Sequence, residues 1–166
     1  MHHAKLGITI VAGLVLAIGG TARCVAADQN AKPLKDTDMV IVGGGSSHDF
    51  DRWFNKADSA LLEKAGASVQ YTDQPQKLPS LLGEKPDVLS LTNNKPIPSK
   101  ASRQAVFDFV ESGKGLVIVH ASTWYNWPDW PAYNRELVGG GARGHVHTTE
   151  FSVEVTAPKH AVMNNV

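Results

Sequence analysis

The hydrophobic and polar positions between residues 39 and 66 form two successive patterns, which predict a strand followed by a helix. The run Met39–Val42 is apolar and ends at three glycines, which is typical of a buried strand in a parallel sheet. We expect Ser46 or Ser47 to cap the helix that follows, and Gly66 to end it. Its apolar residues recur at helical spacing, at Phe50, Trp53, Phe54, Ala57, Leu61 and Ala65.

The rest of the chain repeats this alternation of strands and helices. Further strands are predicted at residues 67–72, 87–92 and 115–120, and helices are predicted from Pro98 and near Tyr133. The run at 115–120 is the most strand-like, and we expect it to be a central strand covered on both faces. Residues 150–157 alternate between apolar and polar side chains, which predicts a strand with one wet face. The order of elements predicts an α/β protein, a three-layer α/β/α sandwich on a mainly parallel sheet.

The first 27 residues have the pattern of a secretory signal peptide. Lys5 precedes an apolar run from Leu6 to about Gly20, and the small residues at 25–27 suit cleavage after Ala27. We therefore expect a secreted or periplasmic protein, with a retained N-terminal anchor as the alternative. Residues 28–38 are expected to be a flexible lead-in to a domain at 39–166.

Charge and cysteine content narrow the function classes. The chain has 16 basic and 16 acidic residues without a block of like charge, so nucleic acid is not an expected partner. Signal cleavage would remove Lys5, Arg23 and Cys24, which leaves 14 basic and 16 acidic residues and a net charge of −2. The mature chain would then have no disulfide and no thiol nucleophile.

The stretch from Gly43 to Asp51 follows the first strand, where many α/β proteins bind a ligand. A dinucleotide site needs a glycine at the position of His48, and a P-loop needs a Gly-Lys-Ser/Thr sequence. Asp49 and Asp51 would also repel a phosphate at this helix N-terminus. A nucleotide site is therefore disfavoured, which leaves a tight corner or a polar pocket containing His48 and Asp49.

Four histidines are expected at one edge of the sheet. His48 follows the first strand, His120 ends a later strand, and His145 and His147 lie in a glycine-rich loop. Ligands of open α/β sheets bind outside the carboxyl ends of the strands. Neutral imidazoles beside Asp49 suit acid–base chemistry or a divalent metal such as zinc, with Asp49 as an oxygen ligand. Each histidine taken alone favours a structural role, and it is their convergence that favours a site.

Three of the four tryptophans fall in one segment that is rich in proline and aspartate. Trp124, Trp127 and Trp130 are expected on a loop, because proline and aspartate disfavour a core helix there. Exposed indole faces suit stacking on the apolar face of a sugar ring. The alternative is a self-packed lid over the edge of the sheet.

An ordered set of motifs resembles the trehalose-utilisation (ThuA-like) domain family over Met39 to Val166. The motifs are VGGGSSHDFDRW, LLEKAGASV, DVLSL, AVFDFVESGKGLVIVHAST, ELVGGGARGHVH, and FSVEV followed by PKH. The resemblance implies a flavodoxin-like sandwich related to class I glutamine amidotransferases. Domains of this family usually continue past the position of Val166, so we expect a C-terminally truncated domain.

The resemblance also bears on the chemistry. In the amidotransferase relatives, the strand matching 115–120 leads to a catalytic cysteine, whereas this chain has His120 followed by Ala121 and Ser122. Cysteine-dependent glutamine hydrolysis is therefore not expected. The family implies carbohydrate metabolism, with trehalose or related glycosides as substrates. The residues carried over from it are His48, Asp49, His120 and His145, and more weakly His147.

These observations support three hypotheses. The first is a carbohydrate-active enzyme on a sugar, keto-sugar or glycoside, in which His120 and His48 are catalytic and Asp49 orients a histidine. The second is a sugar-binding module without chemistry, and the third is a metal-binding protein that uses the four histidines and Asp49. The expected partner is a small-molecule carbohydrate, with no membrane contact after signal cleavage, and a homo-oligomer is left open. The expected substrate contacts are Gly44, Gly45, Ser122, Trp124, Trp127, Trp130 and His145.

Overall fold

The structure is a computed structural model that describes residues 34–124, 127–142, 144, 147–160 and 163. The predicted signal peptide lies outside the described residues. The described strands are β1 (Asp38–Val42), β2 (Ser68–Thr72), β3 (Val88–Leu91) and β4 (Gly115–Ile118). The helical elements are η1 (Asp51–Asp58), α1 (Ser59–Lys64), η2 (Pro75–Lys77), α2 (Leu78–Gly83), α3 (Lys100–Glu111) and η3 (Tyr133–Val138).

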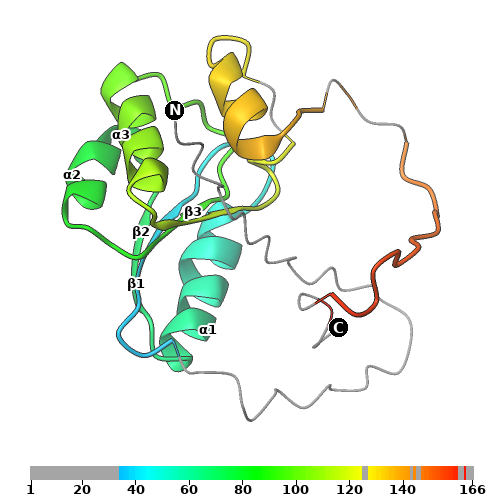
Figure 1. The fold of residues 1–166 in the computed structure, drawn as a ribbon, viewed down its shortest axis with the longest axis horizontal. Helices are drawn as coiled ribbons and strands as arrows, with labels where there is room; N and C mark the ends of the chain where they lie inside the picture. Colours follow the sequence, from blue (N-terminus) through cyan, green and yellow to red (C-terminus); the bar gives the residue numbers. More distant parts are fainter. Residues whose placement is uncertain (1–33, 125–126, 143, 145–146, 161–162, 164–166) are drawn as a thin grey trace, which may run out of the picture.

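The strands form one parallel sheet in the order β2-β1-β3-β4, which confirms the predicted α/β class (Figure 1). The chain steps from β1 to β2 in one direction and then returns past β1 to β3 and β4. Because crossovers between parallel strands are right-handed, this reversal places η1 and α1 on one face and α2 and α3 on the other. The packing of α2 against α3 agrees with this arrangement.

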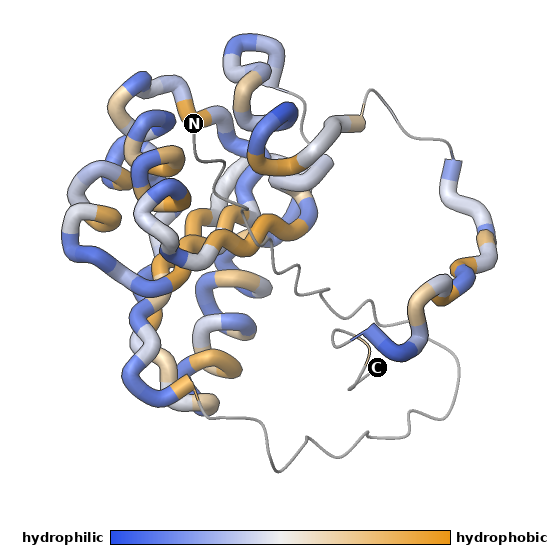
Figure 2. Tube along the Cα trace, in the orientation of Figure 1, coloured by the Kyte–Doolittle hydropathy of each residue, from blue (hydrophilic) through white to orange (hydrophobic). Residues whose placement is uncertain are grey.

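The main core lies between the sheet and the face that carries α2 and α3. Val40, Val42, Leu89 and Leu91 point into it from the two central strands, and Figure 2 shows the strands as a hydrophobic band. These strands are buried on both faces, so their sequences read as continuous apolar runs. The helices, the loop after β4 and η3 complete the same cluster, with Leu78, Leu82, Ile97, Val106, Phe109, Val110, Trp127, Trp130, Tyr133 and Leu137.

Helix boundaries follow local signals in several places. Ser99 caps α3, because its hydroxyl accepts a hydrogen bond from the backbone N–H of Ser102 at 3.3 Å. Gly66 follows α1 with a φ of +105°, and its N–H donates to Glu63, as expected for a helix stop. The predicted helical piece near Tyr133 is confirmed as η3.

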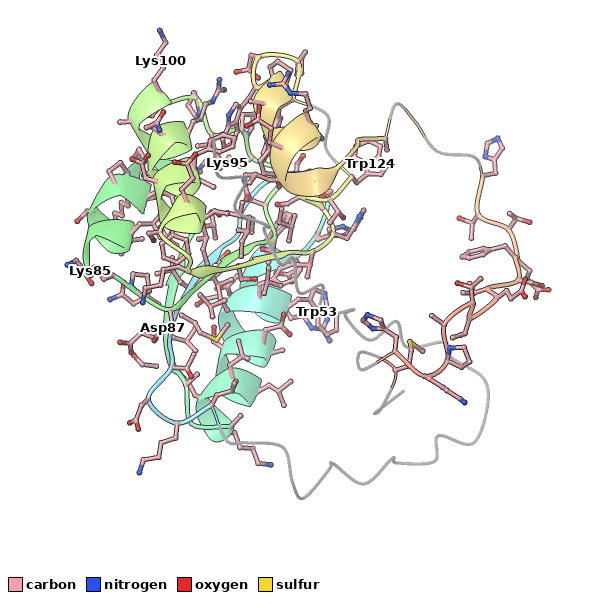
Figure 3. All side chains as sticks on the ribbon, viewed as in Figure 1. Trp53, Lys85, Asp87, Lys95, Lys100 and Trp124 are labelled. Carbon is pink, nitrogen blue, oxygen red and sulfur yellow. The ribbon has the colours of Figure 1, made fainter. Side chains whose placement is uncertain are left out.

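The predicted cap of the first helix is wrong. The helix begins at Asp51, and the carboxylate of Asp49, rather than Ser46 or Ser47, accepts a hydrogen bond from the N–H of Arg52 at 3.0 Å. Its first eight residues are π-helical, which the apolar spacing does not predict. Of the predicted apolar face, Phe50 is buried, whereas Trp53 and Leu61 are exposed, with relative exposures of 51% and 66%. Figure 3 shows the position of Trp53 on this helix.

The prediction of a central strand at residues 115–120 is also wrong. Within the described residues β4 is the outer strand of the sheet, it ends at Ile118, and Leu116, Val117 and Ile118 are only half-buried. Apolar content reports which side chains prefer burial, but it does not report how many neighbours a strand has. The pattern therefore identifies the strand correctly and its position incorrectly.

Residues 150–157 form no strand in this structure, contrary to prediction. The side chains of Phe151, Val153 and Val155 are exposed by 81%, 79% and 49%, and the segment runs away from the sheet in Figure 1. A single strand cannot form its ladder without a partner, so alternation alone is insufficient.

Conversely, α2 is present although its sequence, Leu-Pro-Ser-Leu-Leu-Gly, carries only a short helical pattern. Pro79 occupies its first turn, where a backbone N–H would have no partner within the helix, so the N–H that proline lacks costs no hydrogen bond. None of the helices in the described part of the chain is long and apolar enough to cross a membrane.

Candidate functional site

The candidate site lies at the carboxyl ends of β1 and β3, where the strand order reverses. From this point the chain leaves β1 toward one edge of the sheet and leaves β3 toward the other, so the loops that follow diverge and open a crevice. The loop after β1 carries the three glycines and His48. The loop after β3 contains Asn93, Asn94 and Lys95.

Asn94 holds the glycine turn in place. Its side-chain oxygen accepts a hydrogen bond from the backbone N–H of Ser46 at 3.0 Å, and the backbone N–H of Asn94 donates to the carbonyl of Gly44. Gly45 has a φ of +133°, and a Cβ at this position would overlap the Asn94 side chain. Gly45 is therefore required by close packing of the turn against the loop after β3, whereas a Cβ at Gly43 would overlap Tyr71 of β2.

This turn brings His48 to His120. The ring centroids of the two histidines lie 4.9 Å apart with an angle of 59° between the ring planes, and the ring of Phe50 contacts His48 edge-on with a centroid distance of 5.8 Å. The peptide bond between His120 and Ala121 is cis. Desolvation lowers the pKa of His120 from its ordinary value, and the charge of His48 lowers it further. His120 is therefore a neutral base at neutral pH.

A groove of about 780 Å³ is lined by His48, and His120 reaches it only through its contact with His48. Gly44, Gly45, His48 and Asp49 form one wall, and Tyr71 and Asp73 at the end of β2 form another. Lys95 crosses between the loops, and its ammonium group donates to the carbonyl of Asp73 at 3.0 Å. Burial raises the pKa of Tyr71, and the charges of Asp73 and Asp51 add to this effect.

The lining of the groove is mixed, with a phenol, amides, carboxylates and ammonium groups. The remaining lining residues are Ser46, Phe50, Asp51, Asn55, Thr72, Gln74, Lys77, Asn94 and Lys95. Such a surface offers both donors and acceptors, which suits a neutral polyhydroxylated ligand better than a strongly charged one.

The predicted substrate contact at Ser122 is wrong. Its side chain is fully buried, and its hydroxyl donates to the carbonyl oxygen of Asn93 at 2.7 Å. Tyr133 donates to the carbonyl of Ser122 at 3.3 Å, and burial raises the pKa of this phenol. Ser122 therefore ties the segment after β4 to the loop after β3 and does not face a ligand.

The tryptophan segment is likewise a core element over much of its length. Trp127 and Trp130 are only 3% and 6% exposed, and their rings stack at 5.8 Å with 14° between the planes. Tyr133 packs on both rings. The prediction of exposed sugar-stacking faces is wrong for these two residues, and the self-packed alternative describes them. Trp124 is half-buried (Figure 3).

The predicted cluster of four histidines is only partly present. His48 and His120 meet, His147 is exposed on the segment beyond η3, and His145 lies outside the described residues. Over the described residues, no three side chains of the histidine, cysteine, aspartate and glutamate types are grouped as a metal site requires. Asp49 is exposed and caps the first helix.

Sequence reasoning missed five residues that shape the site, namely Tyr71, Asp73, Asn93, Asn94 and Lys95. Tyr71 and Asp73 lie at the end of one strand, and the three others follow directly on the next strand. Because parallel strands end at the same edge, polar residues at these positions could have been selected by the same rule that selected His120.

Together, the fold and the site define an open α/β protein with a ligand groove at the switch point of a parallel sheet. Comparison with family models gives a match to ThuA, described as trehalose utilisation, over residues 38–166. The chain therefore belongs to the ThuA trehalose-utilisation family. This result confirms the resemblance carried by the motifs.

A solved structure agrees with this fold. It is the crystal structure of a ThuA-like protein from Bacteroides uniformis ATCC 8492, which is 22% identical in sequence and superposes with a TM-score of 0.51. The similarity covers 70% of this chain, and the chain spans about half the length of that protein, 48%. No curated protein matches the chain.

Proposed function

We propose that the protein is a secreted or periplasmic enzyme that acts on a sugar or glycoside at the groove beside His48 and His120. The observation that carries this proposal is the contact between two imidazoles at the switch point, one of which has a lowered pKa. Membership of the trehalose-utilisation family supports a carbohydrate as the ligand.

The two histidines suit complementary roles in proton transfer. His120, which is neutral at neutral pH, can accept a proton from a sugar hydroxyl or a C–H group. His48 contacts His120 and lines the groove, so it can hold the substrate or return the proton to a leaving group. Cys24, the only cysteine of the sequence, belongs to the predicted signal peptide, so a protein cleaved after Ala27 would have no thiol and the proposed chemistry uses none.

Replacing His120 with alanine tests the proposed enzyme directly. Turnover of a panel of disaccharides, glycosides and keto-sugars that includes trehalose should fall by about 10²- to 10⁴-fold, the usual contribution of a general acid or base. His160→Ala is the matched control, because it removes an exposed histidine from the segment beyond η3, and it should retain wild-type turnover. Unchanged turnover in His120→Ala, with an intact circular dichroism spectrum, would remove His120 from the catalytic role.

A binding module without chemistry is the second candidate, because the groove is lined mainly by residues other than the histidines. Calorimetry with the same sugars separates the two functions. A module predicts unchanged affinity in His120→Ala and lost affinity when Tyr71 or Asp73 is replaced by alanine, with no turnover in any variant.

A zinc-dependent protein is a further alternative, because the histidine pair supplies two ligands of a type that zinc prefers. Elemental analysis of the purified protein tests it. Stoichiometric zinc that is lost in His48→Ala would favour this alternative over both sugar proposals.

A further inference from the structure

Two of the glycines after β1 pack closely against polar residues at the end of β2. A Cβ built on Gly43 would lie 2.2 Å from the hydroxyl oxygen of Tyr71, and one built on Gly44 would lie 3.2 Å from the Cβ of Asp73. Gly43 does not have a positive φ, so the closeness of Tyr71, rather than the backbone conformation, requires glycine there. The glycine turn therefore makes room for Tyr71 and Asp73 at the groove.

Both side chains carry polar groups that the protein itself does not use. Tyr71 is half-buried, and its hydroxyl forms no hydrogen bond with any of the described residues. The carboxylate of Asp73 has neither a hydrogen-bond nor an ion-pair partner among these residues, although Lys95 binds the backbone carbonyl of Asp73. A phenylalanine would pack on Gly43 as well as Tyr71 does, so the hydroxyl is available to a ligand.

The two groups are complementary in hydrogen bonding. Burial raises the pKa of Tyr71, and the charges of Asp73 and Asp51 raise it further, so the phenol keeps its proton at neutral pH. The phenol can donate a hydrogen bond, whereas the carboxylate of Asp73 only accepts. The two residues are two positions apart on one strand end and line the same groove as His48.

This pairing indicates the chemistry of the ligand. A ligand that uses both groups must place a hydrogen-bond acceptor next to a donor, and two adjacent hydroxyl groups provide this combination. A ligand ammonium group would pair with Asp73 but leave the phenolic proton unused. A ligand carboxylate would be repelled by Asp73.

We propose that Tyr71 and Asp73 select the ligand through a vicinal diol, with Tyr71 donating to one hydroxyl oxygen and Asp73 accepting from the other hydroxyl. The inference rests on the proposed function for the choice of a sugar as the ligand, but it concerns binding and requires no turnover. Tyr71 and Asp73 are then specificity residues, and Gly43 is a positioning residue that acts through Tyr71.

Calorimetry on the whole protein tests the proposal, with trehalose, methyl glucoside and analogues of each that lack a single ring hydroxyl. The wild type should bind a parent sugar about 10-fold more tightly than an analogue that lacks one hydroxyl of the recognised pair. Tyr71→Phe and Asp73→Asn should each weaken binding of the parent sugar by about 10-fold and lose most of this preference. Asp108→Asn, the same change at an exposed position of α3, is the matched control and should keep both.

Gly43→Ala separates a ligand contact from a merely structural role. Its methyl group would displace the ring of Tyr71, so the variant should lose the diol preference as Tyr71→Phe does. Added to Tyr71→Phe, it should cause no further loss of preference. The midpoint of urea unfolding should be the same in Tyr71→Phe and wild type, because the hydroxyl has no partner among the described residues.

Three results would overturn the proposal: equal weakening for parent sugar and analogue, unchanged affinity in Tyr71→Phe and Asp73→Asn, or no binding of either parent sugar. The proposed enzyme can fail separately. A diol preference that depends on Tyr71 and Asp73, without turnover of any sugar, supports the diol site and contradicts the enzyme. Turnover that depends on His120, with the preference unchanged in the Tyr71 and Asp73 variants, contradicts the diol site alone.

Discussion

At the scale of single residues, the site depends on side chains that hold the backbone as much as on those that face a ligand. Asn94 accepts the hydrogen bond from Ser46, and this fixes the turn that delivers His48 to His120. The proton affinity of His120 then reflects two separate causes, partial removal from water and the neighbouring imidazole. These causes can be separated by substitution.

Replacing His48 with glutamine should raise the pKa of His120 only partway toward its ordinary value of 6.5, because desolvation, the larger cause, remains. NMR titration of the His120 ring protons in wild type and variant measures this shift. Ser47→Ala is the control, since it changes a neighbouring residue without removing a ring. A pKa that is identical in His48→Gln and wild type would contradict the electrostatic coupling.

The lowered pKa also sets the sign of a pH effect. The unfolded chain takes up a proton on His120 at a higher pH than the folded chain does, so protonation favours unfolding. Above its ordinary pKa, His120 is uncharged in both the folded and the unfolded chain and does not change the free energy of unfolding. That free energy decreases as the pH falls below about 6.5. His120→Gln should show a weaker loss of stability over this range in urea titrations.

At the scale of elements, helix signals located α3 correctly because its cap is local. Ser99 satisfies the N–H of Ser102, so Ser99→Ala should reduce the free energy of unfolding by about 1 kcal/mol. Urea denaturation followed by circular dichroism measures this change. Ser80→Ala, the same chemical change at an exposed position of α2, should stay within about 0.5 kcal/mol of wild type. Equal losses in both variants would show that the cap is not the cause.

Sequence pattern predicted most of the elements and the pairing of His48 with His120, because strand ends and glycine turns are local features. It failed where the answer depends on a partner distant in the chain. The apolar run at 115–120 looks the same in a central strand and in an outer one, and the alternation at 150–157 does not specify a neighbour. Burial of Trp127 depends likewise on Trp130 and Tyr133, which cover it.

At the scale of the whole molecule, the loop after β4 is part of the main core rather than a cover on it. Trp130→Ala removes a large buried ring from the cluster that joins α3, η3 and the sheet. The free energy of unfolding should fall by about 3–5 kcal/mol, as for other large-to-small core substitutions. Thermal or urea unfolding, followed by far-ultraviolet circular dichroism, measures this loss.

Trp53→Ala provides the matched control, because the same residue type is removed from a half-exposed position on η1. It should cost about 1 kcal/mol or less. A loss for Trp130→Ala no larger than that for Trp53→Ala would show that the tryptophan segment packs independently of the core.

The hydrogen bond from Ser122 to Asn93 has a consequence for the acquisition of new ligand preferences. It joins the interior under η3 to the loop after β3, whose Asn94 and Lys95 line the groove, and Tyr133 extends the connection into the aromatic cluster. Substitutions at these buried positions would move the residues that line the groove without contacting a bound ligand. Variation in specificity among homologous domains can therefore originate inside the protein, at residues that a survey of the groove surface alone would overlook.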